Sequence, residues 1–280
     1  MLVEVNGVEL CVQTFGDPSD PPVLLIGVTM LSWPEELCAS LAGRYVLRYD
    51  LRDTGRSTVV DPESPGYDLR DLVTDASELV SALRLGPVHV VGLGVGGFIA
   101  QLLALDHPDR IASLTLISTR PVAPGPVDPD LPDHDLELMA RLFAGPEPDW
   151  ADRDSVVEYM VGSARAMSGS RGFAEDEVRV HAAAVFDRAG PSPAAQQASH
   201  LGTMFAAIDC RPRWRERLGE IAAPTLVVHG EEDRFFPHGN GRALAAEIPG
   251  AELLTLPGIG QGLPRATWPV VTEALLRHTA

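Results

Sequence analysis

The sequence predicts an α/β protein with a mostly parallel sheet, helices on both faces and an inserted helical cap. Three observations predict this architecture. Over the first 120 residues, short apolar segments typical of buried strands alternate with segments of helical periodicity. Between residues 121 and 213 this alternation stops, and helical patterns follow a proline-rich stretch. It then resumes, so we expect a core of residues 1–120 and 214–280 and a cap of residues 121–213.

The first half of the chain supplies most of the predicted strands. Val3–Val5 and Glu9–Phe15 alternate around Asn6-Gly7, which is typical of an antiparallel hairpin. Short apolar runs predict further strands at Val23–Ile26, Tyr45–Tyr49, His89–Val91 and Ile111–Ile117. Helical spacing of apolar residues predicts helices at Glu35–Ala42, Leu69–Leu85 and Val95–Asp106. The helix over Leu69–Leu85 has a stop signal in the Gly86-Pro87 that follows it.

The predicted cap begins with turn-forming prolines at Pro121, Pro124, Pro126, Pro129 and Pro132. Four helical patterns follow, at Leu136–Phe143, Ser155–Ala166, Glu175–Asp187 and Ala194–Ile208. The core then closes with strands at Thr225–His229 and Glu252–Leu256 and helices at Gly241–Glu247 and Trp268–His278. A cap inserted here covers the carboxyl ends of the parallel strands, where open α/β sheets bind ligands.

Composition excludes several partners and chemistries. The formal net charge of −17 argues against a nucleic acid or an anionic membrane as partner, because both require a basic face. The chain contains no lysine, which removes Schiff-base catalysis and the lysine of a phosphate-binding P-loop. The widely spaced Cys11, Cys38 and Cys210 fit neither a disulfide framework nor a zinc site. We therefore expect no cofactor and no metal.

The sequence also indicates a cytoplasmic protein. The segment Met1-Leu2-Val3-Glu4-Val5-Asn6-Gly7 lacks the basic and apolar regions of a signal peptide. No apolar run reaches the length that a bilayer span requires. We therefore expect a protein that works without a membrane.

One turn carries most of the information about function. A strand, a glycine turn and a helix form the layout of the nucleophile elbow G-x-S-x-G, and here the turn reads Gly92-Leu93-Gly94-Val95-Gly96-Gly97. The nucleophile position is held by Gly94, which has no hydroxyl, thiol or carboxylate. The same residues satisfy the dinucleotide fingerprint G-x-G-x-x-G, but the next strand ends at Arg120 without the acidic residue that holds a ribose. Nucleotide binding is therefore the weaker interpretation.

Three other segments follow strands in the order found in one large family. They read Arg48-Tyr49-Asp50-Leu51-Arg52-Asp53-Thr54-Gly55-Arg56-Ser57, His229-Gly230-Glu231-Glu232-Asp233 and Leu256-Pro257-Gly258-Ile259-Gly260-Gln261-Gly262-Leu263-Pro264. With the glycine turn, they make the chain resemble the α/β-hydrolase family throughout its length, most closely the aclacinomycin methylesterase type. The resemblance implies an α/β-hydrolase fold and a triad whose nucleophile, acid and histidine fall on Gly94, Asp233 and Gln261. Only the acid is present, since a glutamine amide cannot act as a general base.

The resemblance also implies a function other than hydrolysis. An oxyanion hole needs only backbone amides, here those of Val95 and of Val28 in Gly27-Val28-Thr29. A site that stabilises an oxyanion without a nucleophile suits removal of a proton next to a carbonyl. The family includes triad-less members, among them the peptide epimerase of bottromycin-type biosynthesis. We therefore expect an enzyme that epimerises or isomerises a specialised metabolite or modified peptide between core and cap.

The expected catalytic residue is Asp233, with His181, His200 and Glu158 of the cap, or the substrate's own carboxylate, as alternative bases. The expected substrate-binding residues are Gly27, Val28, Thr29, Gly94, Val95, Gln261, Phe235 and His200. Two other functions stay open. The first is a non-catalytic protein that binds or sequesters such a metabolite. The second is an esterase-like hydrolase with a relocated nucleophile, such as Thr29, Ser32 or Ser118.

Overall fold

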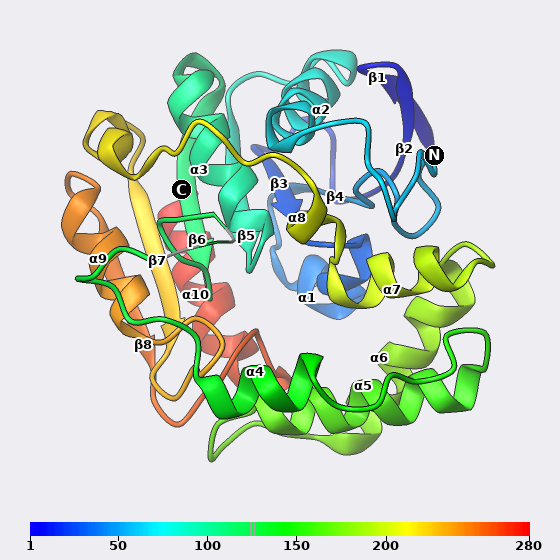
Figure 1. Ribbon diagram of the computed structural model, residues 1–280. Coiled ribbons are helices and arrows are strands. Elements are labelled where there is room, and N and C mark those ends of the chain that lie inside the picture. The colour runs from blue at the N-terminus through cyan, green and yellow to red at the C-terminus, as the bar shows by residue number, and fades with distance from the viewer. Residues whose placement is uncertain (124, 126) are drawn as a thin grey trace.

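The computed structural model describes residues 1–123, 125 and 127–280, and it has the predicted α/β architecture (Figure 1). The described strands form one eight-stranded sheet in the order β1-β2-β4-β3-β5-β6-β7-β8. β1 (Leu2–Val5) and β2 (Val8–Phe15) form the predicted hairpin, and β2 is also antiparallel to β4. The remaining strands pair in parallel: β3 (Pro22–Ile26), β4 (Tyr45–Tyr49), β5 (Val88–Leu93), β6 (Ile111–Ile117), β7 (Thr225–Gly230) and β8 (Glu252–Leu256).

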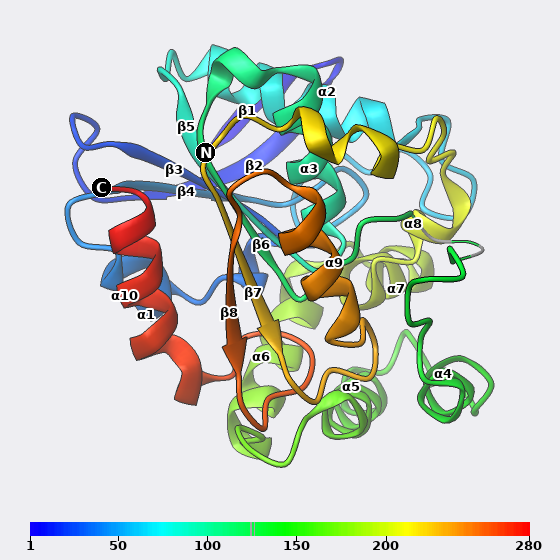
Figure 2. The ribbon, with the colours of Figure 1, turned by 90° about the vertical axis from the view of Figure 1, so that its left-hand side faces the viewer.

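Helices cover both faces of the sheet (Figure 2). One face carries α2 (Leu69–Ala82), α3 (Gly96–Asp106) and α9 (Gly239–Glu247), and the other carries α1 (Glu35–Ser40) and α10 (Trp268–His278). Short 3₁₀ turns lie between these elements: η1 (Met30–Ser32), η2 (Pro108–Arg110), η3 (Arg215–Glu220) and η4 (Arg265–Thr267). In the described part of the chain, no helix has both the length and the apolar character of a bilayer span.

Helix α2 shows how the sequence determines one of these layers. The Asp68 carboxylate accepts hydrogen bonds from the N–H groups of Arg70 and Asp71, and the Asp71 carboxylate accepts one from the N–H of Asp68. This reciprocal cap satisfies amides that the helix itself leaves unpaired. The buried apolar side chains recur at helical spacing: Leu69, Leu72, Val73, Ala76, Leu79 and Val80. Burial of each larger one contributes about 1.5–3 kcal/mol, so the apolar stripe holds the helix on the sheet.

Between β6 and β7 the chain leaves the sheet and forms α4 (Leu136–Phe143), α5 (Arg153–Met167), α6 (Glu175–Arg188), α7 (Pro193–Leu201) and α8 (Met204–Ala207). Helices α4, α5 and α6 lie together beyond one end of the sheet, at the bottom of Figures 1 and 2. α5 and α6 enclose a small apolar cluster that includes Val157 and Ala182. α8 instead contributes Met204 and Phe205 to the main core. The cap boundaries at residues 121 and 213 stay a prediction, and Pro124 and Pro126 lie outside the described residues.

Most predicted elements are confirmed, with ends that differ by a few residues, but one prediction is wrong. The segment Ala194–Ile208, predicted as one helix, contains the two helices α7 and α8. Gly202 lies between them with a φ of +61°, a left-handed conformation that ends an α-helix. The apolar periodicity continues across this break, which is why the sequence pattern predicted a single helix.

Candidate functional site

The turn between β5 and α3 places Gly94 at the carboxyl edge of the sheet. Gly94 has a φ of +58°, in the left-handed region that favours glycine. Its N–H donates to the carbonyl oxygen of Ile117 at 2.9 Å, which fixes the turn against the end of β6. Among the described residues beyond its chain neighbours, a Cβ atom at this position would meet only Gln261 Nε2, at 3.6 Å. The missing side chain therefore leaves open space where an elbow serine would stand.

Two backbone amides beside this space are available to a ligand. Val28 follows β3, and Val95 directly precedes α3. Within the described residues, neither N–H donates a hydrogen bond to a protein acceptor. Val28, Gly94 and Val95 all line a cavity of about 250 Å³, which we call the inner lobe. Amides at the N-terminus of a helix favour a negatively charged oxygen, so this pair has the composition of an oxyanion hole.

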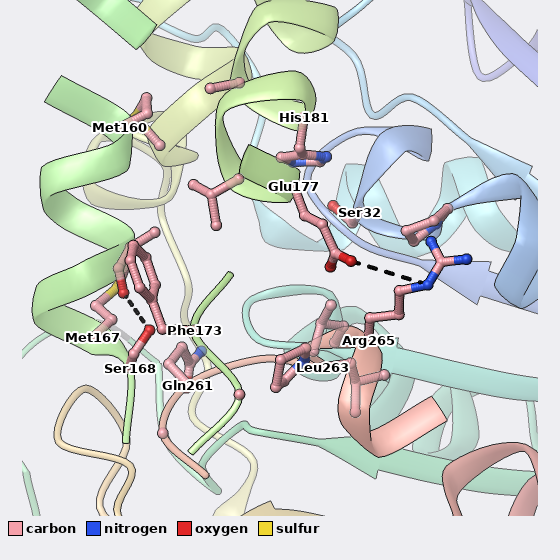
Figure 3. A pocket seen from close by; sticks show the side chains of 18 of the residues that line it. Ser32, Met160, Met167, Ser168, Phe173, Glu177, His181, Gln261, Leu263 and Arg265 are labelled. Carbon is pink, nitrogen blue, oxygen red and sulfur yellow. Dashed lines mark hydrogen bonds and ion pairs between the residues drawn. The ribbon is translucent and has the colours of Figure 1, made fainter. Parts of the chain in front are cut away.

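A second cavity of about 390 Å³, which we call the outer lobe, adjoins the inner lobe between core and cap. The two lobes share the lining residues Val28, Ser32, Leu93, Met160, Met167, His200 and Gln261. Figure 3 shows the outer lobe, with Phe173 and Leu263 on its walls. Glu177 of α6 and Arg265 of η4 form an ion pair there, with 4.0 Å between Oε1 and Nε (Figure 3). The walls are mostly apolar, so the cleft suits a largely apolar ligand.

Gln261 occupies the loop after β8 as a fixed hydrogen-bond donor. Its side-chain Nε2 donates to the carbonyl oxygen of Ser118 at 3.2 Å, and its backbone N–H donates to the carbonyl oxygen of Met167 at 3.1 Å. The side-chain Oε1 is buried without a partner among the described residues. An amide does not titrate near neutral pH, so Gln261 can bind and orient a ligand but cannot accept its proton.

Asp233 lies in the loop after β7 and is sealed from both lobes. Its Oδ1 accepts hydrogen bonds from the N–H groups of Phe235 and Phe236, both at 2.9 Å. Its side chain has no exposed area, and it lines neither lobe. Burial raises the pKa of Asp233 to about 7, although the two N–H donors act in the opposite direction. The catalytic role expected for Asp233 stays a prediction, and its contacts are those of a residue that closes a loop.

His229 forms a buried pair with Asp233. The ring Nε2 lies 2.7 Å from the carbonyl oxygen of Phe236 and 3.6 Å from Asp233 Oδ2. The carbonyl can only accept, so Nε2 carries the proton of the neutral ring. Burial lowers the pKa of His229 to about 4, so the imidazole is neutral at physiological pH. Like Asp233, His229 lines neither lobe.

The bases suggested in the cap lie in three different places. His200 of α7 lines both lobes, and His181 of α6 lines the outer lobe (Figure 3). Burial lowers the pKa of His200 to about 4, and the nearby His181 adds to the effect. Glu158 is exposed and forms an ion pair with Arg179 outside the cleft. Of the three, only the two histidines can reach a ligand.

The remaining expected site residues divide in the same way. Thr29 lines the outer lobe and Phe235 the inner lobe. Gly27 is buried behind Ser32, because a Cβ atom at Gly27 would lie 2.5 Å from the Cβ of Ser32. Of the suggested relocated nucleophiles, Ser32 faces both lobes. The buried Ser118 faces neither, and its Oγ accepts a hydrogen bond from the N–H of Gly262 at 3.2 Å.

Much of the cleft is formed by cap residues that the sequence pattern did not indicate as site residues. They include Tyr159, Met160, Ser163 and Met167 of α5. A signal was present, because Met160 and Met167 are seven residues apart and therefore share one face of a helix. What the periodicity did not indicate is that this face lies over the β5–α3 turn and not in a separate core.

The segment Arg48–Ser57 has a structural role. The Asp50 carboxylate accepts hydrogen bonds from the N–H groups of Met30 at 2.8 Å and Arg56 at 3.0 Å, and it pairs with Arg188 at the end of α6. Asp50 has no exposed side-chain area. The segment thus joins the core to the cap and holds the loop that presents Val28.

Comparison with known proteins defines the family. The sequence profile of the α/β hydrolase fold matches residues 21–261. The chain is 31% identical to a rhodomycin D methylesterase, DauP, from Streptomyces sp. strain C5, over 99% of this chain and 97% of that protein. It is 30% identical, with the same coverage, to the rhodomycin D methylesterase DnrP of Streptomyces peucetius. The chain therefore belongs to the α/β hydrolase fold family.

Solved structures agree with this assignment. A hydrolase from Pseudomonas aeruginosa is 27% identical, with a TM-score of 0.71 over 99% of this chain and 97% of that one. The enol-lactonase from Burkholderia xenovorans LB400 has a TM-score of 0.73 over 99% of both chains, and its 23% identity supports the fold alone. The named relatives are esterases and hydrolases, so they give no support to the epimerase expected from the sequence.

Proposed function

We propose that this protein moves a proton at a carbon next to a carbonyl group and forms no covalent intermediate with its ligand. One observation carries the proposal: the amides of Val28 and Val95, which donate to no acceptor among the described residues, line the same lobe as Gly94, which has no nucleophilic side chain. Loss of such a proton turns the carbonyl into an enolate, whose oxygen is negatively charged. Amides held in place before the reaction stabilise that charge.

The ligand class follows from the cleft and from the relatives. Apolar walls of Met160, Met167, Phe173 and Leu263 fit an apolar body, and the two amides fit one carbonyl oxygen. The relatives named as methylesterases act, by that name, on a methyl ester. We therefore propose that this chain binds the ester, or a similar carbonyl of a specialised metabolite or modified peptide, and epimerises or isomerises it without cleaving it.

The test uses defined probes: single enantiomers of methyl 2-arylpropanoates, which have an apolar ring, an ester carbonyl and one C–H next to it. Each probe is incubated with the protein in heavy water, and thermal unfolding measures which probes bind. We expect each probe that binds to gain one deuterium and lose optical purity, as measured by mass spectrometry and chiral chromatography. A probe that binds without exchange contradicts the proposal.

A binding protein is the second candidate function. The observation that favours it is that Asp233 is sealed from the cleft and Gln261 does not titrate, so two of the three triad positions offer no base and the third offers no nucleophile. In that case the probes would raise the unfolding temperature and stay chemically unchanged. Hydrolysis of the methyl esters, lost in Ser32→Ala, would instead assign a relocated nucleophile.

A further inference from the structure

We infer that His200 of the cap is the group that takes the proton from the ligand. This inference rests on the proposed function and assigns its base to the cap. Asp233, in the loop after β7 where the family resemblance places the acid of the triad, then takes no part in the proton transfer. The inference follows from the lining of the inner lobe, the position of His200 on its helix and the position of the rival groups.

The lining of the inner lobe leaves one base. Among the described residues that line this lobe, the titratable side chains are Tyr159 and His200. The Tyr159 hydroxyl donates to the carbonyl oxygen of Leu142 at 2.6 Å, and burial raises its pKa. The Tyr159 hydroxyl therefore keeps its proton, which it already shares with the carbonyl oxygen of Leu142 in a hydrogen bond. His200 is the remaining side chain that can take up a proton beside Gly94 and Val95.

The surroundings of His200 suit a group that gains and returns a proton. Within the described residues its ring makes no side-chain hydrogen bond, and its Nε2 is buried without a partner. Burial lowers the pKa of His200 to about 4, so the ring is neutral before the ligand reacts but is also a weaker base, and its protonated form needs stabilisation by its surroundings. His200 also lies in the last turn of α7, where the helix dipole stabilises a cation. An enolate formed nearby would stabilise that cation further.

The proposed step balances without a further reactant. The C–H bond next to the carbonyl breaks, and its proton goes to a ring nitrogen of His200. The electron pair of that bond moves toward the carbonyl oxygen, which becomes an oxyanion at the amides of Val28 and Val95. His200 then returns a proton to the carbon, which restores the carbonyl, and delivery to the opposite face, after the planar enolate has turned in the cleft, inverts the configuration. Exchange of that proton with water in the cleft accounts for the uptake of deuterium.

The other candidate bases do not line the inner lobe. Asp233 has no exposed side-chain area and lines neither lobe. Glu158 is exposed at 65% and pairs with Arg179 outside the cleft. His181 and Glu177 line the outer lobe but not the inner lobe that contains Gly94. Among these described groups, His200 alone combines a side chain that is neutral at physiological pH with a position on the wall of both lobes.

The test measures deuterium uptake by a bound methyl 2-arylpropanoate in His200→Gln and His200→Ala. We expect exchange to fall at least about 100-fold in both, the lower end of what a general base contributes. Binding, measured from the probe-induced rise in unfolding temperature, should persist. Added imidazole should restore exchange in His200→Ala, because the cleft can admit it, but not in His200→Gln. The exposed Glu158→Gln is the matched control and should exchange at the wild-type rate.

The outcomes separate the inference from the proposed function. Exchange in the wild type that persists in both His200 variants would overturn the inference while the proposed function stands. Loss of exchange in Asp233→Asn, with exchange retained in His200→Gln, would assign the proton to Asp233 instead. Absence of exchange in the wild type, for a probe that binds, would contradict the proposed function itself.

Discussion

At the scale of single residues, Gly94 and Gln261 occupy the two positions where the family resemblance places a nucleophile and a histidine. Gly94 removes the nucleophile and leaves open space, since a Cβ atom there would meet only Gln261 Nε2 at 3.6 Å. Gln261 is an amide whose Nε2 donates a hydrogen bond to the carbonyl oxygen of Ser118, so it offers no base at its position. Among the described residues, the buried Oδ2 of Asp233 has no hydrogen-bond partner, so one acceptor of the site is still in place. The turn therefore keeps an elbow-like shape without a nucleophile, and the loop after β8 offers an amide in place of a base.

We predict that Gly94→Ser/Gln261→His gains hydrolysis of p-nitrophenyl acetate and that Gly94→Ser alone does not. Serine needs a base, and a histidine at position 261 can supply one, for a gain of at least about 100-fold over Gly94→Ala/Gln261→His. Each change at Gly94 should cost about 1 kcal/mol, because φ is +58°. Release of p-nitrophenol measures the rate. Equal activity in the single and double variants would mean that another group activates the serine.

Asp233 predicts a pH dependence of stability. Its pKa is raised to about 7 in the folded protein by burial, so between pH 4 and 7 the folded chain holds a proton that the unfolded chain has lost. Stability from this group is therefore full at low pH and is lost as the pH rises toward 7. Asp233→Asn removes that loss. The free energy of unfolding of Asp233→Asn, relative to that of the wild type, should therefore rise by about 2–3 kcal/mol from pH 5 to pH 8. Urea unfolding of both proteins at pH 5 and pH 8 measures these free energies. A difference between the two proteins that is the same at both pH values would contradict the prediction.

At the scale of elements, two of the ties between the cap and the core are made where α6 and α5 end. Helix α6 ends at Arg188, which pairs with the buried Asp50, and the end of α5 accepts a backbone hydrogen bond from Gln261. Both ties end beside the cleft, at the loops that present Val28 and Gln261. The cap therefore shapes the cleft and also holds two of its core walls.

We predict that Arg188→Ala destabilises the protein by about 3–5 kcal/mol, because it leaves the Asp50 charge buried without a cation. The matched control is Arg153→Ala. Arg153 pairs with Asp187 at the surface, so its loss should cost less than about 1 kcal/mol. Chemical denaturation of the two variants measures the difference. Equal costs would show that the amide donors to Asp50 alone satisfy the carboxylate.

At the scale of the whole molecule, the net charge of the chain repels an anionic ligand, whereas the arginines of the cleft attract it. The chain carries a formal charge of −17, whereas Arg171 and Arg265 line the outer lobe with only one carboxylate among its described residues, Glu177, which pairs with Arg265. Long-range repulsion of anions is screened by salt, and contacts inside a cleft are screened less. The salt dependence of binding therefore reports which of the two dominates.

We predict that a 2-arylpropanoate acid binds more tightly as ionic strength rises, while its methyl ester shows no such change. Raising the ionic strength from about 0.01 M to about 0.15 M shortens the screening length from about 30 Å to about 8 Å, which weakens the repulsion by the whole chain. Calorimetric titration of both ligands measures the effect. Weaker binding of the acid at high salt would show that the arginines of the outer lobe dominate.

The sequence predicted the core better than the site, for physical reasons. The β5–α3 turn follows from local glycine spacing, so the amino-acid pattern alone could place Gly94, Val95 and Val28 at one edge of the sheet. The sealing of Asp233 depends on the backbone of Phe235 and Phe236 folding back onto its carboxylate, which no local pattern encodes. The approach of α5 and α7 to the turn depends on packing between segments about 70 to 100 residues away from it in the chain. The patterns that predict the fold class are local and recur along the chain, whereas the cleft depends on contacts between residues that are far apart in the sequence.

The strand order has a consequence for how such proteins diversify. The chain leaves the sheet at Ile117 and returns at Thr225, and β6 and β7 are adjacent parallel strands. The two ends of the inserted segment therefore start from neighbouring positions, so a different connection can join them as long as it is long enough for a parallel crossover and supplies the core contacts that Met204 and Phe205 make here. Recognition of the ligand becomes an exchangeable module, inherited or engineered apart from the sheet, as long as an arginine equivalent to Arg188 travels with it to meet Asp50.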